Sequence, residues 1–394
     1  MFCQLEALRH CLAPIVCRTL EMLPESLDET YERILKAINK ANQRHAHRLL
    51  QCLTVAIRPL RVEELAEVLA VNVNAEGIPE LNADWRWENQ EEAILSACSS
   101  LVSIITDNGS RVVQFSHFSV KEFLTSDRLA SSTEEVSQFY IPVEPSHVIL
   151  AQACLSVLLS LDHHMDYASS KKIPLVRYAA EHWVKHAEVG NVELHMKDTL
   201  DYFFSTEKPH FSVWVQIQDV DKILRFYMSS PPDGVSTSAF PLYFAAKRGF
   251  CGLVERLIAK HPEHVNHWCG DYGSPLHASV LGGHIEVSQL LVACGADINS
   301  HFEMQDNWTP LHIASREGHL KIVKWLLDCG ADANFKTNLG CTPPHFAAAF
   351  GHLDIARILL GHNAGVNSQD DENGSSLLVL HRAFGGPGNQ VAIM

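Results

Sequence analysis

Apolar residues recur at helical spacing through most of the first 130 residues. Residues three or four positions apart share one face of a helix, so this spacing predicts amphipathic helices. Ser26 and Glu29 form a capping-box pattern, in which Ser26 accepts from the Glu29 N–H and the Glu29 side chain reaches back. Further helices are expected at 1–20, 46–57, 62–69 and 91–98.

Two runs rich in β-branched residues follow, over 101–105 and 111–115. The residues between them include Asn108-Gly109, a pair that favours the tight turn of a β-hairpin. A second capping-box pattern, from Ser119 to Glu122, predicts that a helix begins directly after the hairpin. Helices, a hairpin and a further helix are the components of a winged-helix domain.

A regular repeat occupies the C-terminal part of the chain. Aligned on the residue after Pro-Leu, its copies place Tyr243, His277, His312, His345 and His381 at spacings of 34, 35, 33 and 36 residues. A period this regular indicates an array of stacked units.

The copy at 307–333 shows the local pattern of each repeat. Thr309 is a good helix N-cap, Pro310 occupies the first helical position, and Gly318 can adopt the left-handed conformation that ends a helix. A second helix is expected over 320–328. Its apolar side is too broad for two helices to bury, so the neighbouring copies must cover it.

Three of the copies carry closely similar motifs, each followed by Gly-His: Ser274-Pro275-Leu276-His277, Thr309-Pro310-Leu311-His312 and Thr342-Pro343-Pro344-His345. On these motifs the stretch 237–394 resembles ankyrin repeats, with a divergent first copy and an incomplete fifth copy. The resemblance implies that the array binds another protein. The repeat histidines are expected to bond the loop backbone of the neighbouring repeat.

Two segments in the first half of the chain carry a second resemblance. Residues 23–31 (LPESLDETY) and 117–124 (HFSVKEFL) are similar to the winged-helix segment that follows the nucleotide-binding core in fungal NACHT-type STAND proteins. Residues 178–183 (YAAEHW) resemble the helical segment of the same family. The expected fold is therefore mainly α, with a winged-helix region at 1–130, a helical linker at 131–235 and ankyrin repeats at 236–394.

The NACHT resemblance would also imply a P-loop, but Gly-x-x-x-x-Gly-Lys-Ser/Thr is absent from this sequence. Without those backbone donors and that lysine, phosphate is not cradled. Either the chain begins inside a longer protein or it is a shortened relative. We expect a non-enzymatic interaction module of ankyrin type without a cofactor, serving as the sensor part of a STAND-like signalling protein. The alternative is the C-terminal fragment of an NTP-hydrolysing NACHT switch.

His117 lies between an expected strand and an expected helix. In the resembling family, a histidine at this place senses the phosphate of bound ADP. The alternative is a histidine that only hydrogen-bonds at the end of the strand. The absence of a P-loop favours this alternative.

Histidine pairs elsewhere do not predict a metal site. His182 and His186 are four apart on an expected helix, but Trp183 takes the place of the glutamate that a zincin motif requires. His163-His164, and His261 with His264, are expected to be solvated because no cysteine or acid was identified beside them at metal spacing. No motif for a catalytic nucleophile is present either.

The charge balance bears on the class of partner. The chain has 31 Lys and Arg against 46 Asp and Glu, a net charge of −15, which argues against nucleic acid or an anionic membrane. The expected recognition helices, at 62–67 and 119–122, carry acidic residues where phosphates would lie. Eleven cysteines without a Cys-x-x-Cys pair, and the lack of an apolar run of bilayer length, lead us to expect a cytoplasmic protein.

The concave side of the array, formed by hairpin tips and first-helix positions, is the expected binding surface. Trp308 beside Phe350 and Arg316 has the composition favoured at interface hot spots. The alternative for each position is an ordinary exposed loop residue. The ankyrin resemblance implies these contact positions: Asp271, Gly273, Leu281, Gln305, Asp306, Trp308, Arg316, Glu317, Asn338, Leu339, Cys341, Ala349 and Phe350.

Overall fold

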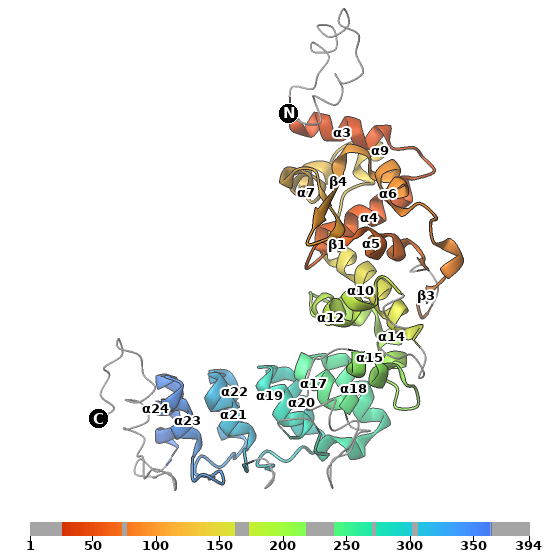
Figure 1. The fold of residues 1–394 in the computed structure, drawn as a ribbon. Coiled ribbons are helices and arrows are strands. Elements are labelled where there is room, and N and C mark those ends of the chain that lie inside the picture. Colours follow the sequence, from red (N-terminus) through yellow and green to blue (C-terminus); the bar gives the residue numbers. More distant parts are fainter. Residues whose placement is uncertain are drawn as a thin grey trace, which may run out of the picture. The chain divides into compact units, whose positions relative to one another are not determined.

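The computed structural model describes residues 26–72, 77–161, 173–217, 240–269, 273–301, 306–362 and 364. They fall into two compact units, and the boundary lies between Phe203 and Phe204. Helices prevail over strands in both units, which confirms the mainly α fold class (Figure 1). The helix expected at 1–20 and the incomplete fifth repeat lie outside the described residues.

Unit 1 contains the four helices that the described part of the N-terminal pattern predicts. They are α3 (Leu27–Ala37), α4 (Gln43–Val55), α5 (Val62–Leu69) and α6 (Gln90–Cys98). The Ser26 hydroxyl caps α3 and accepts from the Glu29 N–H at 3.2 Å, as predicted. Leu35, Leu49 and Leu65 bury one face of α3, α4 and α5 respectively, so their helical spacing identified true core positions.

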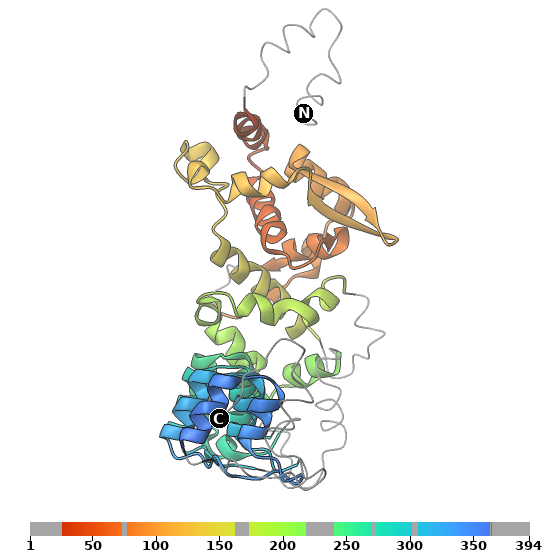
Figure 2. The same cartoon turned by 90° about the vertical axis from the view of Figure 1, so that its left-hand side faces the viewer.

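The predicted hairpin consists of β4 (Val102–Asp107) and β5 (Ser110–Phe115), which extend from the helices of unit 1 (Figure 2). Its turn residues Asn108 and Gly109 both have positive φ, at 46° and 78°, which is the geometry that makes an Asn-Gly pair favourable. A third strand, β1 (Leu60–Arg61), pairs with β5 and gives the order β1-β5-β4. The sequence pattern did not predict β1, because two residues are too short to show alternation.

The helix after the hairpin begins two residues earlier than predicted. The N-cap of α7 (Phe118–Leu124) is His117, whose Nδ1 accepts from the Ser119 N–H at 3.3 Å. The Ser119 hydroxyl lies inside the helix and bonds the Tyr31 hydroxyl at 2.7 Å. The predicted capping box from Ser119 to Glu122 is therefore wrong, because the serine links α7 to α3 while the histidine caps the helix.

Unit 1 continues with short helices and one long, buried helix. The long helix α10 packs against α12 and α4, and its buried residues include Leu150, Leu155 and Leu158. The remaining elements are β2 (Val71–Asn72), β3 (Glu80–Leu81), η1 (Ala83–Trp85), η2 (Ser99–Leu101), α8 (Asp127–Ala130), α9 (Glu134–Ser137), α10 (Val143–Leu159), α12 (Val176–Ala187), α13 (Val192–His195) and α14 (Lys197–Phe203).

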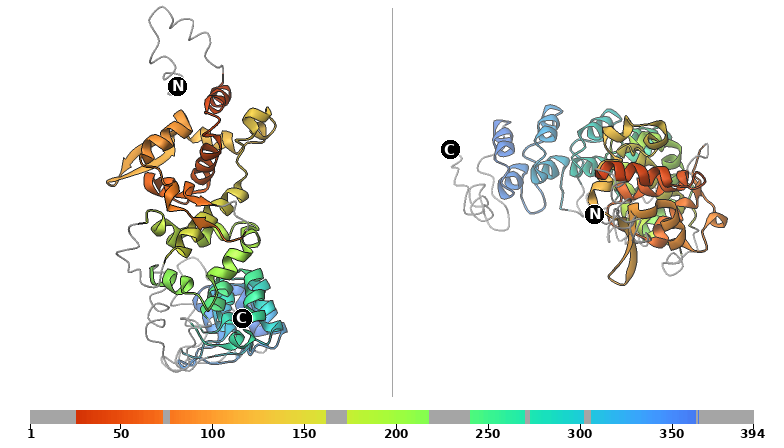
Figure 3. Two further views of the ribbon diagram at one scale, coloured as in Figure 1. Left: turned by 90° about the vertical axis from the view of Figure 1, so that its right-hand side faces the viewer. Right: turned by 90° about the horizontal axis from the view of Figure 1, so that it is seen from above.

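Unit 2 contains successive pairs of antiparallel helices, which follow one another in a row (Figure 3). The first helices contact in order, α17 with α19, α19 with α21 and α21 with α23. This stacking is the arrangement that the regular period predicts. The elements are α15 (His210–Ile217), α17 (Phe240–Arg248), α18 (Cys251–Lys260), η4 (Pro262–Asn266), α19 (Pro275–Leu281), α20 (Ile285–Ala293), α21 (Pro310–Glu317), α22 (Leu320–Asp328), α23 (Pro343–Ala349) and α24 (Leu353–Gly361).

The repeat at 307–333 has the local structure that its sequence predicts. Thr309 is the N-cap of α21, Pro310 is its first residue, and Gly318 ends it with a φ of 80°. The second helix, α22, spans the predicted residues. It buries Ile322, Val323, Leu326 and Leu327.

Candidate functional site

Histidines in the first turn of α19 and α21 join neighbouring repeats. The His312 Nδ1 accepts from the Thr309 N–H at 3.1 Å, so the ring proton resides on Nε2. That Nε2–H donates to the Cys341 carbonyl in the next repeat at 3.2 Å. His277 bonds the Trp308 carbonyl in the same way, at 3.1 Å. The predicted repeat-to-repeat role of these histidines is confirmed.

Burial keeps these rings neutral. It lowers the pKa of His277 to about 4 and that of His312 to about 3, and the backbone hydrogen bonds only partly oppose this shift. A neutral ring has one donor and one acceptor nitrogen, which matches the two partners of each histidine. The positions of Trp308 and Cys341, two predicted contact residues, are thus set by buried hydrogen bonds from the preceding repeat.

The structure brings together the three residues proposed as the centre of the binding surface. The Arg316 Cζ lies 5.5 Å from the ring centroids of both Trp308 and Phe350, within the range of a cation–π contact. The Phe350 side chain is 53% exposed, whereas Trp308 is half-buried. The Trp308 Nε1–H donates to Asp306 Oδ2 at 3.2 Å, which orients the indole ring.

Phe346 is a member of this cluster that the sequence reasoning missed. Its ring centroid lies 4.4 Å from that of Trp308 and 5.6 Å from that of His312. It occupies the position directly after the Pro343-Pro344-His345 motif. Its helical position, one residue after a repeat histidine, was the available signal.

The loop tips beside the cluster are linked to each other. The Asn338 N–H donates to the Asp306 carbonyl at 3.1 Å, and the next residue, Leu339, is 41% exposed. Glu317 is exposed beside Arg316, with 3.6 Å between Oε1 and the guanidinium Nε. These contacts place a hydrogen-bonded polar rim next to the aromatic pair.

The other predicted contact positions are less accessible or not described. Leu281, Cys341 and Ala349 are half-buried. Gly273 is buried, and a Cβ there would lie 2.3 Å from the Trp268 ring, so its role is to admit that ring. Asp271 and Gln305 lie outside the described residues. The predicted concave surface as a whole stays a prediction.

His117 is exposed to solvent, and it also caps α7. Its Nδ1 contacts the Ser119 backbone N–H and, at 2.7 Å, the Ser119 hydroxyl. Its ring centroid lies 4.3 Å from that of the exposed Phe118. These contacts use the nitrogen that faces the helix. The role of His117 as a nucleotide sensor stays a prediction.

His186 belongs to a buried hydrogen-bond chain. The Ile57 N–H donates to the Tyr178 hydroxyl at 3.1 Å, and that hydroxyl is hydrogen-bonded to His186 Nε2 at 2.9 Å. On the other side of the ring, His186 Nδ1 faces His147 Nδ1 at 2.8 Å. Burial lowers the pKa of His186 to about 3. Both ring nitrogens of His186 therefore have protein partners. The structural interpretation of His182 and His186 as a pair stays a prediction.

The structure corrects the expectation for His261 and His264. His264 is buried rather than solvated, and Glu263 supplies an acidic partner for both histidines. The sequence reasoning overlooked this residue because it lies between them. His163 and His164 lie outside the described residues.

A further helix of unit 1 also bears on nucleic-acid recognition. The helix directly before the hairpin is α6, with the sequence QEEAILSAC, and Glu91 at its start pairs with Arg111 of β5 at 2.9 Å. In α5, the Glu64 carboxylate is fully buried and accepts from Arg58 at 2.8 Å. An acidic α6 and a buried α5 carboxylate give phosphates no cationic contact there. The absence of nucleic-acid binding stays a prediction.

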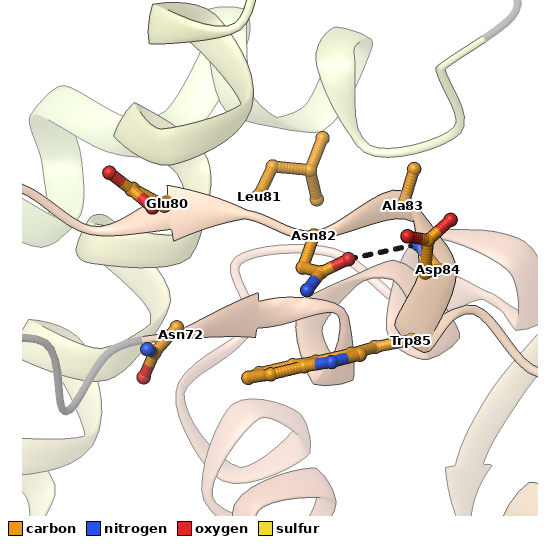
Figure 4. Close-up of a pocket in the computed structure, with 7 residues that line it drawn as sticks. All are labelled: Asn72, Glu80, Leu81, Asn82, Ala83, Asp84 and Trp85. Carbon is orange, nitrogen blue, oxygen red and sulfur yellow. Dashed lines mark hydrogen bonds between the residues drawn. The ribbon is translucent and has the colours of Figure 1, made fainter.

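A small hollow lies between β2, β3 and η1 of unit 1 (Figure 4). Its volume is about 220 Å³, below the ~300 Å³ at which small-molecule sites usually begin. Inside it, the Asn82 Oδ1 accepts from the Asp84 N–H at 3.0 Å. Its two charged residues are acidic, so it does not suit a phosphate. The lining residues are Asn72, Glu80, Leu81, Asn82, Ala83, Asp84 and Trp85.

No described helix is a candidate for a membrane span. None of them combines the length and the apolar character that a bilayer crossing requires.

Comparison with known proteins finds a matching family model for a segment in each half of the chain. Residues 31–134 match the family model described as GPI inositol-deacylase, winged helix domain. Residues 242–337 and 299–370 match the model for ankyrin repeats in three copies. The chain carries a winged-helix domain and ankyrin repeats. The resemblances to ankyrin repeats and to a winged-helix segment are thereby confirmed, and the cluster around Arg316 lies within the ankyrin repeats.

A fungal protein is similar over much of the chain. It is the azaphilone pigments biosynthesis cluster protein L of Monascus ruber, 32% identical over 297 residues. The match covers 71% of this chain and 61% of the relative, so the chain spans about three fifths of that protein's length.

Proposed function

We propose that this chain binds a partner protein through the ankyrin surface around Arg316, and that it is the sensor part of a STAND-like signalling protein without catalytic activity of its own. Ankyrin repeats are protein-interaction modules, and their presence supports the first part. The match to a winged-helix domain supports the second part.

The observation that carries the proposal is the position of the Arg316 guanidinium against two aromatic rings, 5.5 Å from each centroid. Arginine and tryptophan are enriched where interfaces concentrate binding energy. The side chain of Arg316 is 33% exposed, so a partner can contact its free edge. The rings restrict the arginine before binding, which reduces the entropy lost when a partner immobilises it.

The test compares Arg316→Ala/Phe350→Ala with a control pair of exposed residues outside the surface. The exposed Phe350 is chosen over Trp308, whose ring packs on Phe346 and whose loss would disturb the fold. Arg357→Ala and Phe118→Ala are the controls, because both side chains are more than half exposed. All variants are first checked by circular dichroism and thermal melting.

A photocrosslinking residue at position 350 of the full chain identifies the partner in an extract of the source organism. The purified partner is then titrated calorimetrically against each variant. The double variant is expected to bind at least about tenfold more weakly, a loss of about 1.4 kcal/mol. An affinity within about twofold of wild type, or an equal loss in the controls, would contradict the proposal.

A further inference from the structure

Three metal-ligating groups meet at the end of the first ankyrin repeat. His261 follows α18, and Glu263 and His264 lie in the short helix η4, so four consecutive residues supply all three groups. One ligand atom from each lies within 4.8 Å of the others. The Glu263 Oε1 is 3.3 Å from His261 Nδ1 and 3.7 Å from His264 Nε2.

These separations fit a single metal ion with little movement of the backbone. Nitrogen and oxygen ligands about 2.0–2.2 Å from a tetrahedral zinc ion lie about 3.3–3.6 Å from one another. The two separations from Glu263 Oε1, 3.3 and 3.7 Å, are close to this range. The contacts of Glu263 therefore place a carboxylate oxygen and two imidazole nitrogens where ligands of one ion would be.

The surroundings orient the rings for such a role. The His261 Nε2 faces the Thr206 hydroxyl at 3.4 Å, on the side of the ring opposite to Glu263. A hydrogen bond at one ring nitrogen fixes the tautomer and directs the other nitrogen to a metal. The His264 ring stacks on that of His261, with centroids 4.9 Å apart and an interplanar angle of 20°.

We propose that His261, Glu263 and His264 bind a divalent transition-metal ion of the zinc class. Two imidazoles and a carboxylate suit Zn²⁺, Ni²⁺ or Cu²⁺ better than the oxygen-seeking Mg²⁺ and Ca²⁺. The side chains of His261 and Glu263 are 35% and 57% exposed, so an ion reaches the site from solvent. Three protein ligands leave a fourth position for water or for a group from another molecule. The proposal does not depend on the partner surface around Arg316.

The experiment titrates ZnCl₂ into the full chain by isothermal calorimetry and compares two ligand variants with a control. Glu263→Gln and His261→Ala remove exposed ligands, so they are expected to fold, and circular dichroism checks this. His362→Ala is the matched control, an exposed histidine at the end of α24. The control is needed because the chain has 23 histidines, 21 of them outside this site, and 11 cysteines, and both residue types are zinc ligands.

We expect the wild type and His362→Ala to bind one zinc ion with the same affinity. We expect Glu263→Gln and His261→Ala to bind this ion at least about tenfold more weakly. Zinc should slow amide hydrogen exchange at 261–267 in wild type and not in Glu263→Gln, while Mg²⁺ should slow it in neither. A wild type without this binding step would overturn the proposal. So would ligand variants that keep wild-type affinity, since the residues would then form a hydrogen-bonded cluster only.

Discussion

At the scale of single residues, a glycine of one repeat packs against a histidine of the next repeat. The His352 Nε2 donates to the Arg316 carbonyl at 3.0 Å, across the boundary between two repeats. A Cβ at Gly318 would lie 2.6 Å from the His352 ring, so the absence of a side chain at Gly318 admits the histidine. The pairs Gly283 with His319 and Gly249 with His284 have the same close approach.

Gly318→Ala should therefore destabilise the array more than Gly330→Ala. Both glycines have positive φ, at 80° and 90°, which costs about 1 kcal/mol for alanine. Nothing lies within 4 Å of a Cβ at Gly330, whereas one at Gly318 displaces the His352 ring and its hydrogen bond, for a further 1–3 kcal/mol or so. Urea unfolding measures both. Equal losses would show that the contact with His352 has no energetic role.

The sequence predicted part of the candidate surface and missed the rest for a physical reason. Trp308, Arg316 and Phe350 were grouped because the ankyrin resemblance assigns them to one face, and the structure places them in contact. Phe346 was missed because its contact with Trp308 depends on how one repeat packs on the next, which the spacing within a single repeat does not define. Glu263 was missed although its contacts are local, because it lies between the two histidines that it contacts.

At the scale of elements, buried histidines make the junctions between repeats sensitive to acid. His277 and His312 connect α19 and α21 to the following loops through neutral rings. Their folded pKa values, about 4 and about 3, are below the ordinary value of 6.5. In the unfolded chain these rings bind protons first, so their contribution to stability is complete above pH 6.5 and decreases as the pH falls toward 4.

We expect the free energy of unfolding of the ankyrin repeats to fall between pH 6.5 and pH 4.5 by up to about 1.4 kcal/mol per pH unit for each of these two histidines. Denaturant unfolding followed at several pH values measures the slope. The ring signals of His277 and His312 in the NMR spectrum should stay those of neutral imidazole over this range. Titration of either ring near pH 6.5 in the folded protein would contradict the expectation.

Local patterns predicted elements well where the apolar spacing was regular. The bounds of α5 and α22 agree with the prediction, since buried residues recur at helical spacing in both helices. The start of α7 differs from the prediction, because Ser119 bonds the Tyr31 hydroxyl and His117 caps the helix instead. The two-residue strand β1 depends on its pairing with β5, which no local pattern contains.

At the scale of the whole molecule, the resemblances predicted a winged-helix domain followed by ankyrin repeats, and both are present. The predicted division at residues 130 and 235 stays a prediction, although the structure separates into two units after Phe203. The class of molecule that this chain binds depends on the distribution of charge over the whole chain. A net charge of −15 and an acidic α6 continue to favour a protein partner over nucleic acid.

The same whole-chain view predicts that this polypeptide does not bind nucleotides. No Gly-x-x-x-x-Gly-Lys-Ser/Thr motif occurs in the sequence, the hollow beside Trp85 is small and acidic, and the Nδ1 of His117 contacts Ser119. Calorimetric titration with Mg-ATP and Mg-ADP should therefore give no binding heat at micromolar protein. A dissociation constant below about 10 μM requires about 7 kcal/mol of binding free energy, which these groups do not provide. If a nucleotide bound at that strength and His117→Ala abolished the binding, the histidine would be established as a phosphate ligand. If the binding survived the substitution, the nucleotide site would lie elsewhere in the chain.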